Sequence, residues 1–347
     1  MIDGIAGAPA RHNNFDFLRV FAAFMVLFSH QYALNGLPEP LLGSKALGNV
    51  GVLIFFSISG FLVSQSWRND PHWVRFVAKR FLRIWPGLAV VTLLAAFVLG
   101  PIVSTLSTSA YFAGPDFIDF FNNLKLMAIR YHLPGVFETN LYPKAVNGSL
   151  WTIPLEVRCY LALSLIGLIG LARRRWIAVL ALLGLVAYYF GVVRDPNNYQ
   201  YQFALYFFLG TCLDVYRDKW DAQPLKLLAP AAVLSAVAFL LGAVDVGLLL
   251  ILPACVIVFG TRSTPVVNRF GRFGDLSYGI YIYAFPVQQT LIWAGAAKLP
   301  FAVGLMLAAA VTVAFAWFSW HLVEGPALGF KPGRRAKVPA APVVSGA

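Results

Sequence analysis

Five ionisable side chains lie within long apolar runs of the sequence: Asp16, Arg19 and His30 in the first run, and Glu156 and Arg158 in a later one. A charged side chain at the centre of a bilayer costs about 2.5–3.5 kcal/mol or more, so each of these residues needs a partner or a function. Histidine and glutamate can carry out general acid–base chemistry. Asp16 and Arg19 are three residues apart and can pair on one helical face, near the membrane surface.

His30 is the strongest candidate for catalysis. It follows Arg19 by eleven residues, about three helical turns, so the two share a face and lie roughly 16 Å apart along the axis. Glu156 comes seven residues after Ser149, where its run begins, and this predicts the same depth in the membrane as His30. A carboxylate there could orient the imidazole as a general base. Two unrelated polar contacts would fit the same pattern.

A second group of candidates consists of the cations Lys79, Arg80 and Arg83, before the third apolar run. Arg80 and Arg83 are three residues apart on one helical face, and guanidinium groups at that spacing can hold phosphates. The alternative is a topological anchor or a contact with lipid headgroups. Neither the three cysteines nor any other residues are spaced for a metal site.

The composition indicates which elements must position these residues. Hydrophobic residues make up 59% of the 347 residues, and charged residues 12%, about half of the usual share of about 25%. Soluble globular, disordered and disulfide-rich proteins are therefore excluded. The sequence predicts an all-α polytopic membrane protein with about ten transmembrane helices. The expected spans are 15–34, 50–66, 84–103, 149–171, 176–193, 200–216, 225–242, 245–260, 276–297 and 300–322.

The basic residues predict the orientation of these spans. The connections on one side hold 19 of the 27 Lys and Arg residues and those on the other side hold six, which makes both termini cytoplasmic. The net charge of +12 therefore reflects topology, and no nucleic-acid partner is expected. Residues 1–14 would be a cytoplasmic segment, 15–325 the membrane domain, and 326–347 a disordered cytoplasmic tail. Residues 104–148 would form an extracytoplasmic loop with a short interfacial helix.

Several segments, taken in order, resemble the membrane-bound acyltransferase family 3, whose members O-acylate bacterial surface carbohydrates. The resemblance covers roughly residues 13–325. Its segments are 15–19 followed by His30, 51–61, 80–86, 149–156, 276–281 and 324–326. It implies ten helices, acetyl-coenzyme A as the donor, a catalytic His30, and donor binding by Arg19, Arg80 and Arg83. One departure is Leu53, where many members carry an acidic residue.

The expected function is therefore O-acyl transfer, with acetyl as the expected group. The acyl group would move from cytosolic acyl-coenzyme A to a hydroxyl of an extracytoplasmic carbohydrate, such as exopolysaccharide, O-antigen or its lipid-linked precursor. The protein would lie in the bacterial inner membrane. His30 would be the base, with Glu156 orienting it or positioning the acceptor, and Lys79 would join the arginines at the donor. Expected substrate-binding residues are Asn147, Trp151 and Tyr160.

Two other classes of protein remain open from the residues alone. A multi-pass transporter could use His30, Glu156 and Arg19 as a proton or substrate relay, although the sequence has no internal repeat. An accessory subunit for polysaccharide export would not need His30.

Overall fold

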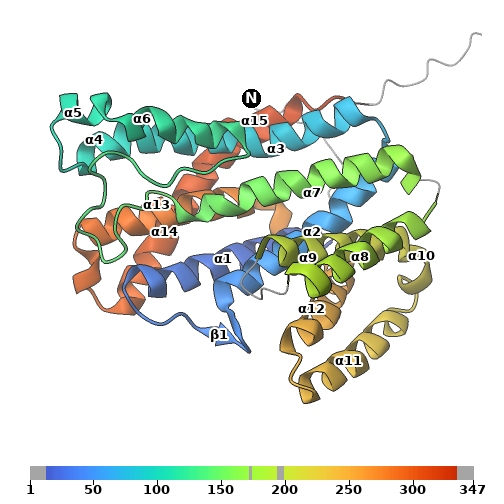
Figure 1. The fold of residues 1–347 in the computed structure, drawn as a ribbon. Coiled ribbons are helices and arrows are strands. Elements are labelled where there is room, and N and C mark those ends of the chain that lie inside the picture. The colour runs from blue at the N-terminus through green and yellow to red at the C-terminus, as the bar shows by residue number, and fades with distance from the viewer. Residues whose placement is uncertain (1–12, 172–173, 194–198, 334–347) are drawn as a thin grey trace, which may run out of the picture.

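A computed structural model describes residues 13–171, 174–193 and 199–333, and these residues form a bundle of helices (Figure 1). The described residues contain a single antiparallel pair of two-residue strands, β1 (Leu41–Leu42) and β2 (Lys45–Ala46). The α-helices are α1 (Phe15–Leu34), α2 (Leu47–Asn69), α3 (Trp73–Leu94), α4 (Gly100–Val103), α5 (Thr108–Ala113), α6 (Pro115–Asp119), α7 (Ile153–Ile166), α8 (Trp176–Tyr188), α9 (Tyr199–Val215), α10 (Arg217–Trp220), α11 (Leu225–Leu240), α12 (Val244–Thr261), α13 (Ser277–Trp293), α14 (Phe301–Ser319) and α15 (Gly325–Gly329).

Short segments with π or 3-10 geometry extend or connect these helices. The π segments are η1 (Ala95–Leu99), η4 (Gly167–Leu171), η5 (Tyr189–Val193) and η8 (Trp320–Glu324), and the 3-10 segments are η2 (Phe120–Lys125), η3 (Gly148–Thr152), η6 (Val267–Phe273) and η7 (Ala296–Lys298). Through η1, α3 continues into α4 as one helix from Trp73 to Val103.

Seven helices of the described residues are long and apolar enough to cross a membrane. They are Phe15–Leu34, Leu47–Asn69, Trp73–Val103, Gly148–Gly170, Trp176–Val193, Val244–Thr261 and Phe301–Gly329. The other three predicted spans coincide with α9, α11 and α13, which have only 17, 16 and 17 residues. An almost wholly helical fold with seven helices that could span a membrane is therefore confirmed, whereas ten spans and cytoplasmic termini remain predictions.

Parts of the predicted topology lie outside the described residues. They are residues 1–12 of the N-terminal segment, residues 334–347 of the tail, and the basic residues Arg11, Arg173, Arg194, Arg334, Arg335 and Lys337. The beginning of the expected tail is helical, because α15 continues the chain from η8 as far as Gly329.

The third span begins eleven residues earlier than residue 84, where the sequence placed it. The His72 side chain accepts a hydrogen bond from the backbone N–H of Arg75, and this caps the first turn of α3. Arg75 and Lys79 both donate to Asp70 just before the helix, and these two cations hold the pKa of Asp70 well below its usual range. The predicted basic loop is therefore mostly helix, and Arg80 and Arg83 project from its side.

Glycines allow α2 and α9 to pack closely. A Cβ atom on Gly60 of α2 would lie 1.8 Å from the carbonyl oxygen of Phe207 in α9. A Cβ atom on Gly210 of α9 would lie 2.2 Å from the carbonyl oxygen of Ser57. Small residues at such crossings let two helix backbones approach, which is a common way of associating helices in membranes. This contact fixes α2, whose other face carries Ser59 of the candidate site.

We expect Gly60→Ala to destabilise the protein by about 1–3 kcal/mol or more, because backbone rather than a flexible side chain opposes the new methyl group. The measurement is the thermal unfolding temperature of the purified protein in detergent. Gly184→Ala in α8 is the matched control, since a Cβ atom there would meet nothing within 4 Å. Equal unfolding temperatures for the two variants would contradict the close packing.

The 104–148 connection is folded and packed against the bundle. The predicted short helix is present as α6 and η2, and Phe117 and Phe120 bury their rings in one cluster with Ala95 and Ala96. Beyond it, residues 140–147 run along α13 in an irregular conformation, held by side-chain amides. Figure 1 shows this connection beside α13 and α14, at the end of the bundle near α4 and α5.

Candidate active site

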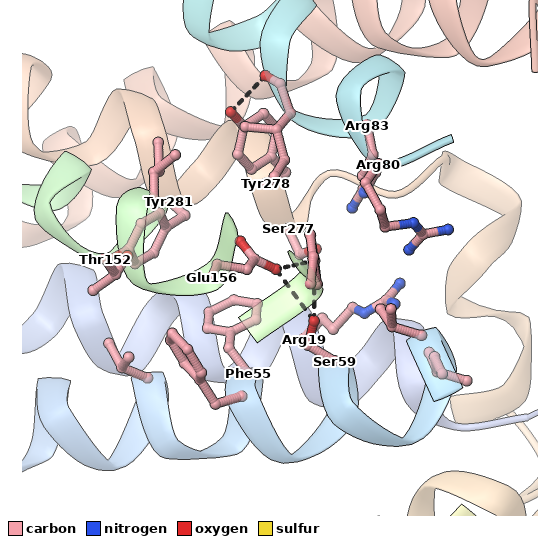
Figure 2. Close-up of a pocket in the computed structure, with 17 residues that line it drawn as sticks. Arg19, Phe55, Ser59, Arg80, Arg83, Thr152, Glu156, Ser277, Tyr278 and Tyr281 are labelled. Carbon is pink, nitrogen blue, oxygen red and sulfur yellow. Dashed lines mark hydrogen bonds between the residues drawn. The ribbon is translucent and has the colours of Figure 1, made fainter. Parts of the chain in front are cut away.

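A cavity lies among α1, α2, α3, α7 and α13 (Figure 2). Five predicted site residues line it, although they come from three helices that are distant in the sequence. These are Arg19, Arg80, Arg83, Glu156 and Tyr160. Ser59, Thr152, Ser277, Tyr278 and Tyr281 complete its polar lining. The structure therefore gathers the predicted donor-binding arginines and the predicted carboxylate in one place.

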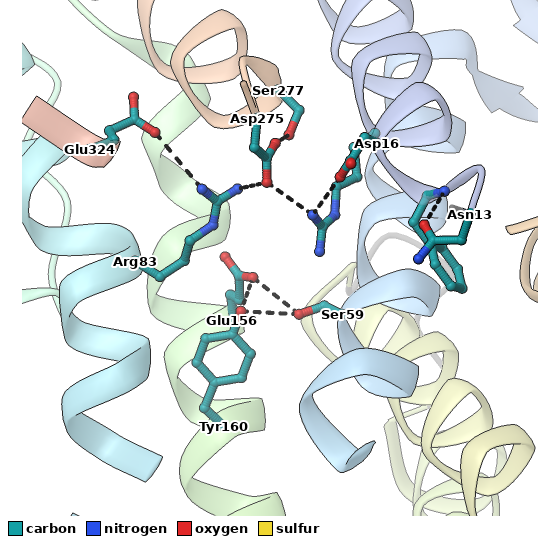
Figure 3. A network of polar contacts seen from close by, with 11 residues as sticks. Asn13, Asp16, Ser59, Arg83, Glu156, Tyr160, Asp275, Ser277 and Glu324 are labelled. Atoms are coloured by element: carbon teal, nitrogen blue, oxygen red, sulfur yellow. Dashed lines mark hydrogen bonds and ion pairs between the residues drawn. The ribbon is translucent and has the colours of Figure 1, made fainter. Parts of the chain in front are cut away.

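Asp275, which lies just before α13, joins two of these arginines (Figure 3). Arg19 Nη1 donates to Asp275 Oδ2 at 3.0 Å, and Arg83 Nη2 donates to the same oxygen at 2.7 Å. Ser277 Oγ donates to the other oxygen, Oδ1, at 2.6 Å. Burial raises the pKa of Asp275, but the positive charges of Arg83 and Arg19 lower it by more than burial raises it. The net result is a pKa of about 2. One carboxylate thus ties α1, α3 and α13 together.

We expect Asp275→Asn to lower the free energy of unfolding by roughly 2–3 kcal/mol, because it leaves two guanidinium groups without a carboxylate. A carboxyl group with a lowered pKa stabilises the fold above its unfolded pKa of about 3.9, and this contribution is lost as the pH falls toward 2. The difference in unfolding temperature from wild type should therefore be full at neutral pH and shrink below about pH 4. Asp218→Asn, at an exposed ion pair, is the control. A difference that grows on acidification would contradict the assignment.

Arg80 differs from its neighbours because, among the described residues, no carboxylate oxygen lies within 4 Å of its guanidinium group. Its Nε is buried and has no hydrogen-bond partner there. Its guanidinium carbon lies 5.8 Å from the ring centroid of Tyr160 and 6.0 Å from that of Phe76. A partly buried cation without a counter-ion is costly, so this geometry favours an anionic ligand at Arg80.

Glu156 forms a compact polar group with Ser59 and Tyr160. Ser59 Oγ donates to Glu156 Oε1 at 3.2 Å, and the Tyr160 hydroxyl donates to the same oxygen. The hydroxyl groups of Ser59 and Tyr160 are 3.0 Å apart. Figure 2 shows the Glu156 side chain directed into the cavity. Tyr160, expected from the sequence to bind substrate, therefore supports Glu156 from one helical turn away, and Ser59 provides an interhelical hydrogen bond.

His30 does not meet Glu156, contrary to the expected depth match. Helices α1 and α2 are antiparallel, and a Cβ atom on Gly48 of α2 would lie 2.9 Å from Ser29, next to His30. Ser59, the partner of Glu156, lies eleven residues further along α2, which corresponds to roughly 16 Å. Glu156 therefore lies near the level of Arg19, far below His30.

The depth prediction was wrong because Ser149 does not lie at the end of the bundle. Asn147 Nδ2 donates to the carbonyl of Ile282, which is eleven residues before the end of α13 at Trp293. The run that carries Glu156 thus starts already deep in the bundle. Nothing in the apolar pattern marks this, because the irregular segment before it is itself inside the bundle.

The His30 ring contacts an aromatic side chain of α13. Its ring packs edge-on against Phe285 with the centroids 5.2 Å apart, and its Nδ1 is buried without a hydrogen-bond partner among the described residues. His30 and Arg19 share one face of α1, as their spacing predicted. The histidine is therefore separate from the arginine cavity but lies on the same helix face.

Three other predicted site residues have contacts outside the cavity. Lys79 pairs with Asp70 at 2.7 Å and does not join the arginines. Asn147 is buried, where it caps η3 and bonds to α13. Trp151 packs against the rings of Tyr199 and Phe203, with centroids 6.0 and 5.5 Å away. The structure thus connects Asn147 and Trp151 with packing, and it connects Lys79 with the start of α3.

The end of the cavity toward His30 is bounded by a contact between η3 and α13. The hydroxyl groups of Thr152 and Tyr281 are 2.7 Å apart, and both side chains are buried. The Phe55 ring of α2 packs edge-on against Tyr281 at 5.7 Å. This contact lies one helical turn of α13 below Phe285, and so between the cavity and His30.

A family model described as an acyltransferase domain matches residues 12–321, which include every helix around the cavity. The chain belongs to acyltransferase family 3. Among curated proteins it is similar to the O-acetyl transferase of Shigella phage Sf6, with 32% identity over 90% of this chain and 95% of that protein. It is also similar to nodulation protein 10 of Rhizobium leguminosarum bv. viciae, with 31% identity over 92% and 94%. No solved structure matches the chain.

The family assignment confirms the resemblance found in the sequence, and the protein is an acyltransferase with several helices long and apolar enough to span a membrane. Asp275, which bridges two arginines of the site, was not among the residues predicted from the sequence of this acyltransferase. The available signal was its position directly before the segment 276–281, within a connection that is otherwise basic. Glu324 was noticed only as part of a segment, and it lies 3.9 Å from Arg83, with Ser319 donating to its other oxygen.

Proposed function

We propose that this acyltransferase is an O-acetyltransferase of the bacterial inner membrane. It would take an acetyl group from cytosolic acetyl-coenzyme A and transfer it to a hydroxyl of an extracytoplasmic carbohydrate. The observation that carries the proposal is Arg80, a cation without a carboxylate partner among the described residues, in a cavity with Arg19 and Arg83. Similarity to a protein named O-acetyl transferase supports the acetyl group and the oxygen acceptor.

In this proposal, the arginines bind the phosphates of the donor. Three guanidinium groups in one cavity suit a ligand with several phosphates, since each can form paired, charge-assisted hydrogen bonds. The distance from Arg19 to His30 is roughly 16 Å along α1. An extended chain of about five residue lengths spans this distance, which is comparable to the pantetheine arm that carries the thioester. To reach His30 the arm would have to part the contact between Thr152 and Tyr281.

His30 would act at the thioester end. An unprotonated ring nitrogen of His30 would accept the proton of the acceptor hydroxyl while the hydroxyl oxygen attacks the thioester carbon. As the carbon–sulfur bond breaks, the imidazolium would return that proton to the departing sulfur, and coenzyme A would leave as the thiol. The role of Glu156 changes from the one first expected, because it does not contact His30. We assign Glu156 to the arginine cavity, where with Tyr160 and Ser59 it would shape the passage of the donor.

The direct test is transfer of a labelled acetyl group by the purified protein in lipid nanodiscs. The acceptor is surface polysaccharide from the expressing strain, with its own acetyl groups removed by mild base. Label should appear in the polysaccharide in the presence of acetyl-coenzyme A, and not with the His30→Ala variant. Absence of transfer by folded wild-type protein would contradict the proposal, as would movement of a substrate between compartments without a covalent product.

Sidedness gives an independent prediction. In a variant whose three cysteines are replaced by alanine, a cysteine at Ser107 before α5 should react with an impermeant maleimide added to spheroplasts. One at Gln223, between α10 and α11, should react only after lysis, because the basic asymmetry puts that connection inside. Both positions are exposed, so accessibility alone should not distinguish them. A reversed pattern would make the acceptor cytosolic.

A further inference from the structure

Two half-exposed tyrosines, Tyr142 and Tyr131, lie at the end of the molecule beyond His30. Their exposed fractions are 48% and 37%. The backbone N–H of Val146 donates to the carbonyl of Tyr131 at 2.8 Å, so the segment that carries Tyr131 pairs with the segment that follows Tyr142. Exposed aromatic rings next to a proposed catalytic residue need an explanation, since neither is part of the cavity described above.

Tyr142 is connected to His30 through a single ring. The Tyr142 ring packs edge-on against Phe285 with the centroids 6.2 Å apart, and Phe285 packs edge-on against His30 at 5.2 Å. The centroids of Tyr142 and His30 are therefore no more than about 11.4 Å apart. A ligand of one or two sugar rings that rests on Tyr142 could place a hydroxyl at the imidazole.

The backbone around Tyr142 is held firmly on α13. Gln289 Nε2 donates to the carbonyls of Tyr142 and Ala145, at 2.8 and 2.9 Å. Asn140 Nδ2 donates to Gln289 Oε1 at 2.8 Å. The neighbouring Lys144 has a φ of +66°, a conformation that non-glycine residues rarely adopt and that persists only where surrounding contacts impose it. The backbone that carries the Tyr142 ring is therefore already ordered, which lowers the entropy lost when a ligand stacks on the ring.

Buried polar atoms beside His30 indicate the chemistry of that ligand. Gln288 Nε2 donates to the carbonyl of Leu27 and to Gln31 Oε1, which lie on either side of His30 in α1. Gln288 Oε1 and His30 Nδ1 are both buried and, among the described residues, have no hydrogen-bond partner. A polyhydroxylated ligand can donate to the amide oxygen and also serve the imidazole, whereas a lipid chain can do neither.

We infer that Tyr142 and Tyr131 form a stacking platform for the carbohydrate acceptor and direct one of its hydroxyl groups toward His30. The inference rests on the proposed function and adds the acceptor subsite to it. The apolar face of a sugar ring, with its polarised C–H bonds, suits the negative face of an aromatic ring. Tyr142 and Tyr131 replace Asn147 and Trp151 as the residues to which we assign acceptor binding.

The alternative is that Tyr142 belongs to the belt of aromatic residues that anchors proteins at the membrane surface. Trp293 at the end of α13 is a suitable control for this alternative, because it is 42% exposed and packs in an apolar groove away from His30. Loss of a belt residue should affect insertion or stability, and it should leave the KM for the acceptor unchanged.

The test measures acetyl transfer to the deacetylated surface polysaccharide at varied acceptor and donor concentrations. Tyr142→Ala should raise the acceptor KM about 5- to 10-fold, with kcat and the acetyl-coenzyme A KM unchanged. Tyr142→Phe should stay within about twofold of wild type, because it keeps the ring. Tyr131→Ala should act in the same direction, and Trp293→Leu should leave the acceptor KM unaltered.

The outcomes separate the platform from the proposed function. If wild-type protein transfers no acetyl group to the polysaccharide, the proposed function fails. If it does and folded Tyr142→Ala has a normal acceptor KM, only the platform fails. A fall in kcat or a change in the donor KM in that variant, without a change in the acceptor KM, would mean that Tyr142 merely supports Phe285 and His30, and would also overturn the platform.

Discussion

His30→Ala should reduce acetyl transfer by about 10²–10⁴-fold, the usual effect of removing a general base. A larger loss is expected if His30 itself carries the acyl group between donor and acceptor. The fold should survive, because the only ring contact of His30 among the described residues is with Phe285 and its Nδ1 forms no hydrogen bond there. The measurement is the initial rate of label transfer by purified protein at saturating acetyl-coenzyme A.

His321→Ala is the matched control for this prediction. His321 lies in η8 with an exposed side chain, and its ring stacks on Trp317 and hydrogen-bonds to the Trp317 carbonyl. The His321→Ala variant should transfer acetyl groups at the wild-type rate. A loss of rate in His30→Ala alone would therefore show that His30 has a specific role. A well-folded His30→Ala protein with near-normal turnover would rule out the proposed mechanism.

Arg80→Ala should weaken acetyl-coenzyme A binding by about 10- to 100-fold, because a charge-assisted hydrogen bond contributes roughly 1.5–3 kcal/mol. Among the donor-binding candidates this residue should show the largest effect, since Arg19 and Arg83 already share Asp275. Lysine at position 80 should restore binding only in part, because it keeps the charge but loses the planar fork. Isothermal titration with coenzyme A measures the affinity without requiring an acceptor.

Arg175→Ala controls for the change in net charge. Arg175 is exposed and pairs with Asp218 outside the cavity, and we place it on the same side of the membrane as Arg80. The affinity of the Arg175→Ala variant for coenzyme A should be unchanged at physiological salt. Exposed charges more than about 8 Å from the ligand are largely screened under these conditions. Equal losses in both variants would mean that Arg80 contributes only through general electrostatics.

The fold could be predicted well from the sequence, because long apolar runs have few structural solutions in a membrane. Each predicted span coincides with a helix. The predicted start of a helix was wrong where its first turns carry charge. In α3, His72 caps the first turn and Asp70 neutralises Lys79, so the helix begins at Trp73. Hydropathy records the charge but not the partners that neutralise it.

The candidate site could be predicted only as separate pieces. The residues of the arginine cavity were identified individually, but Asp275 joins partners 256 and 192 positions away, and no local pattern reveals such a contact. The expected pairing of His30 with Glu156 failed for a related reason. The depth of Glu156 depends on where the preceding segment, residues 140–147, lets its helix begin. That irregular segment lies along α13 inside the bundle, and nothing in the apolar pattern of the sequence marks it.

If the protein binds one substrate from each side of the membrane, as proposed, the contact between Thr152 and Tyr281 would also matter for the energy supply of the cell. An enzyme that binds one substrate from each side of a membrane resembles a channel, and a continuous file of water through it would dissipate the proton gradient. Here the two hydroxyl groups bond to each other, and the ring of Phe55 packs against Tyr281. While these side chains stay in contact, they separate the arginine cavity from His30, and only a bound donor would part them. The same helices that hold the substrates would therefore preserve the membrane as an insulator.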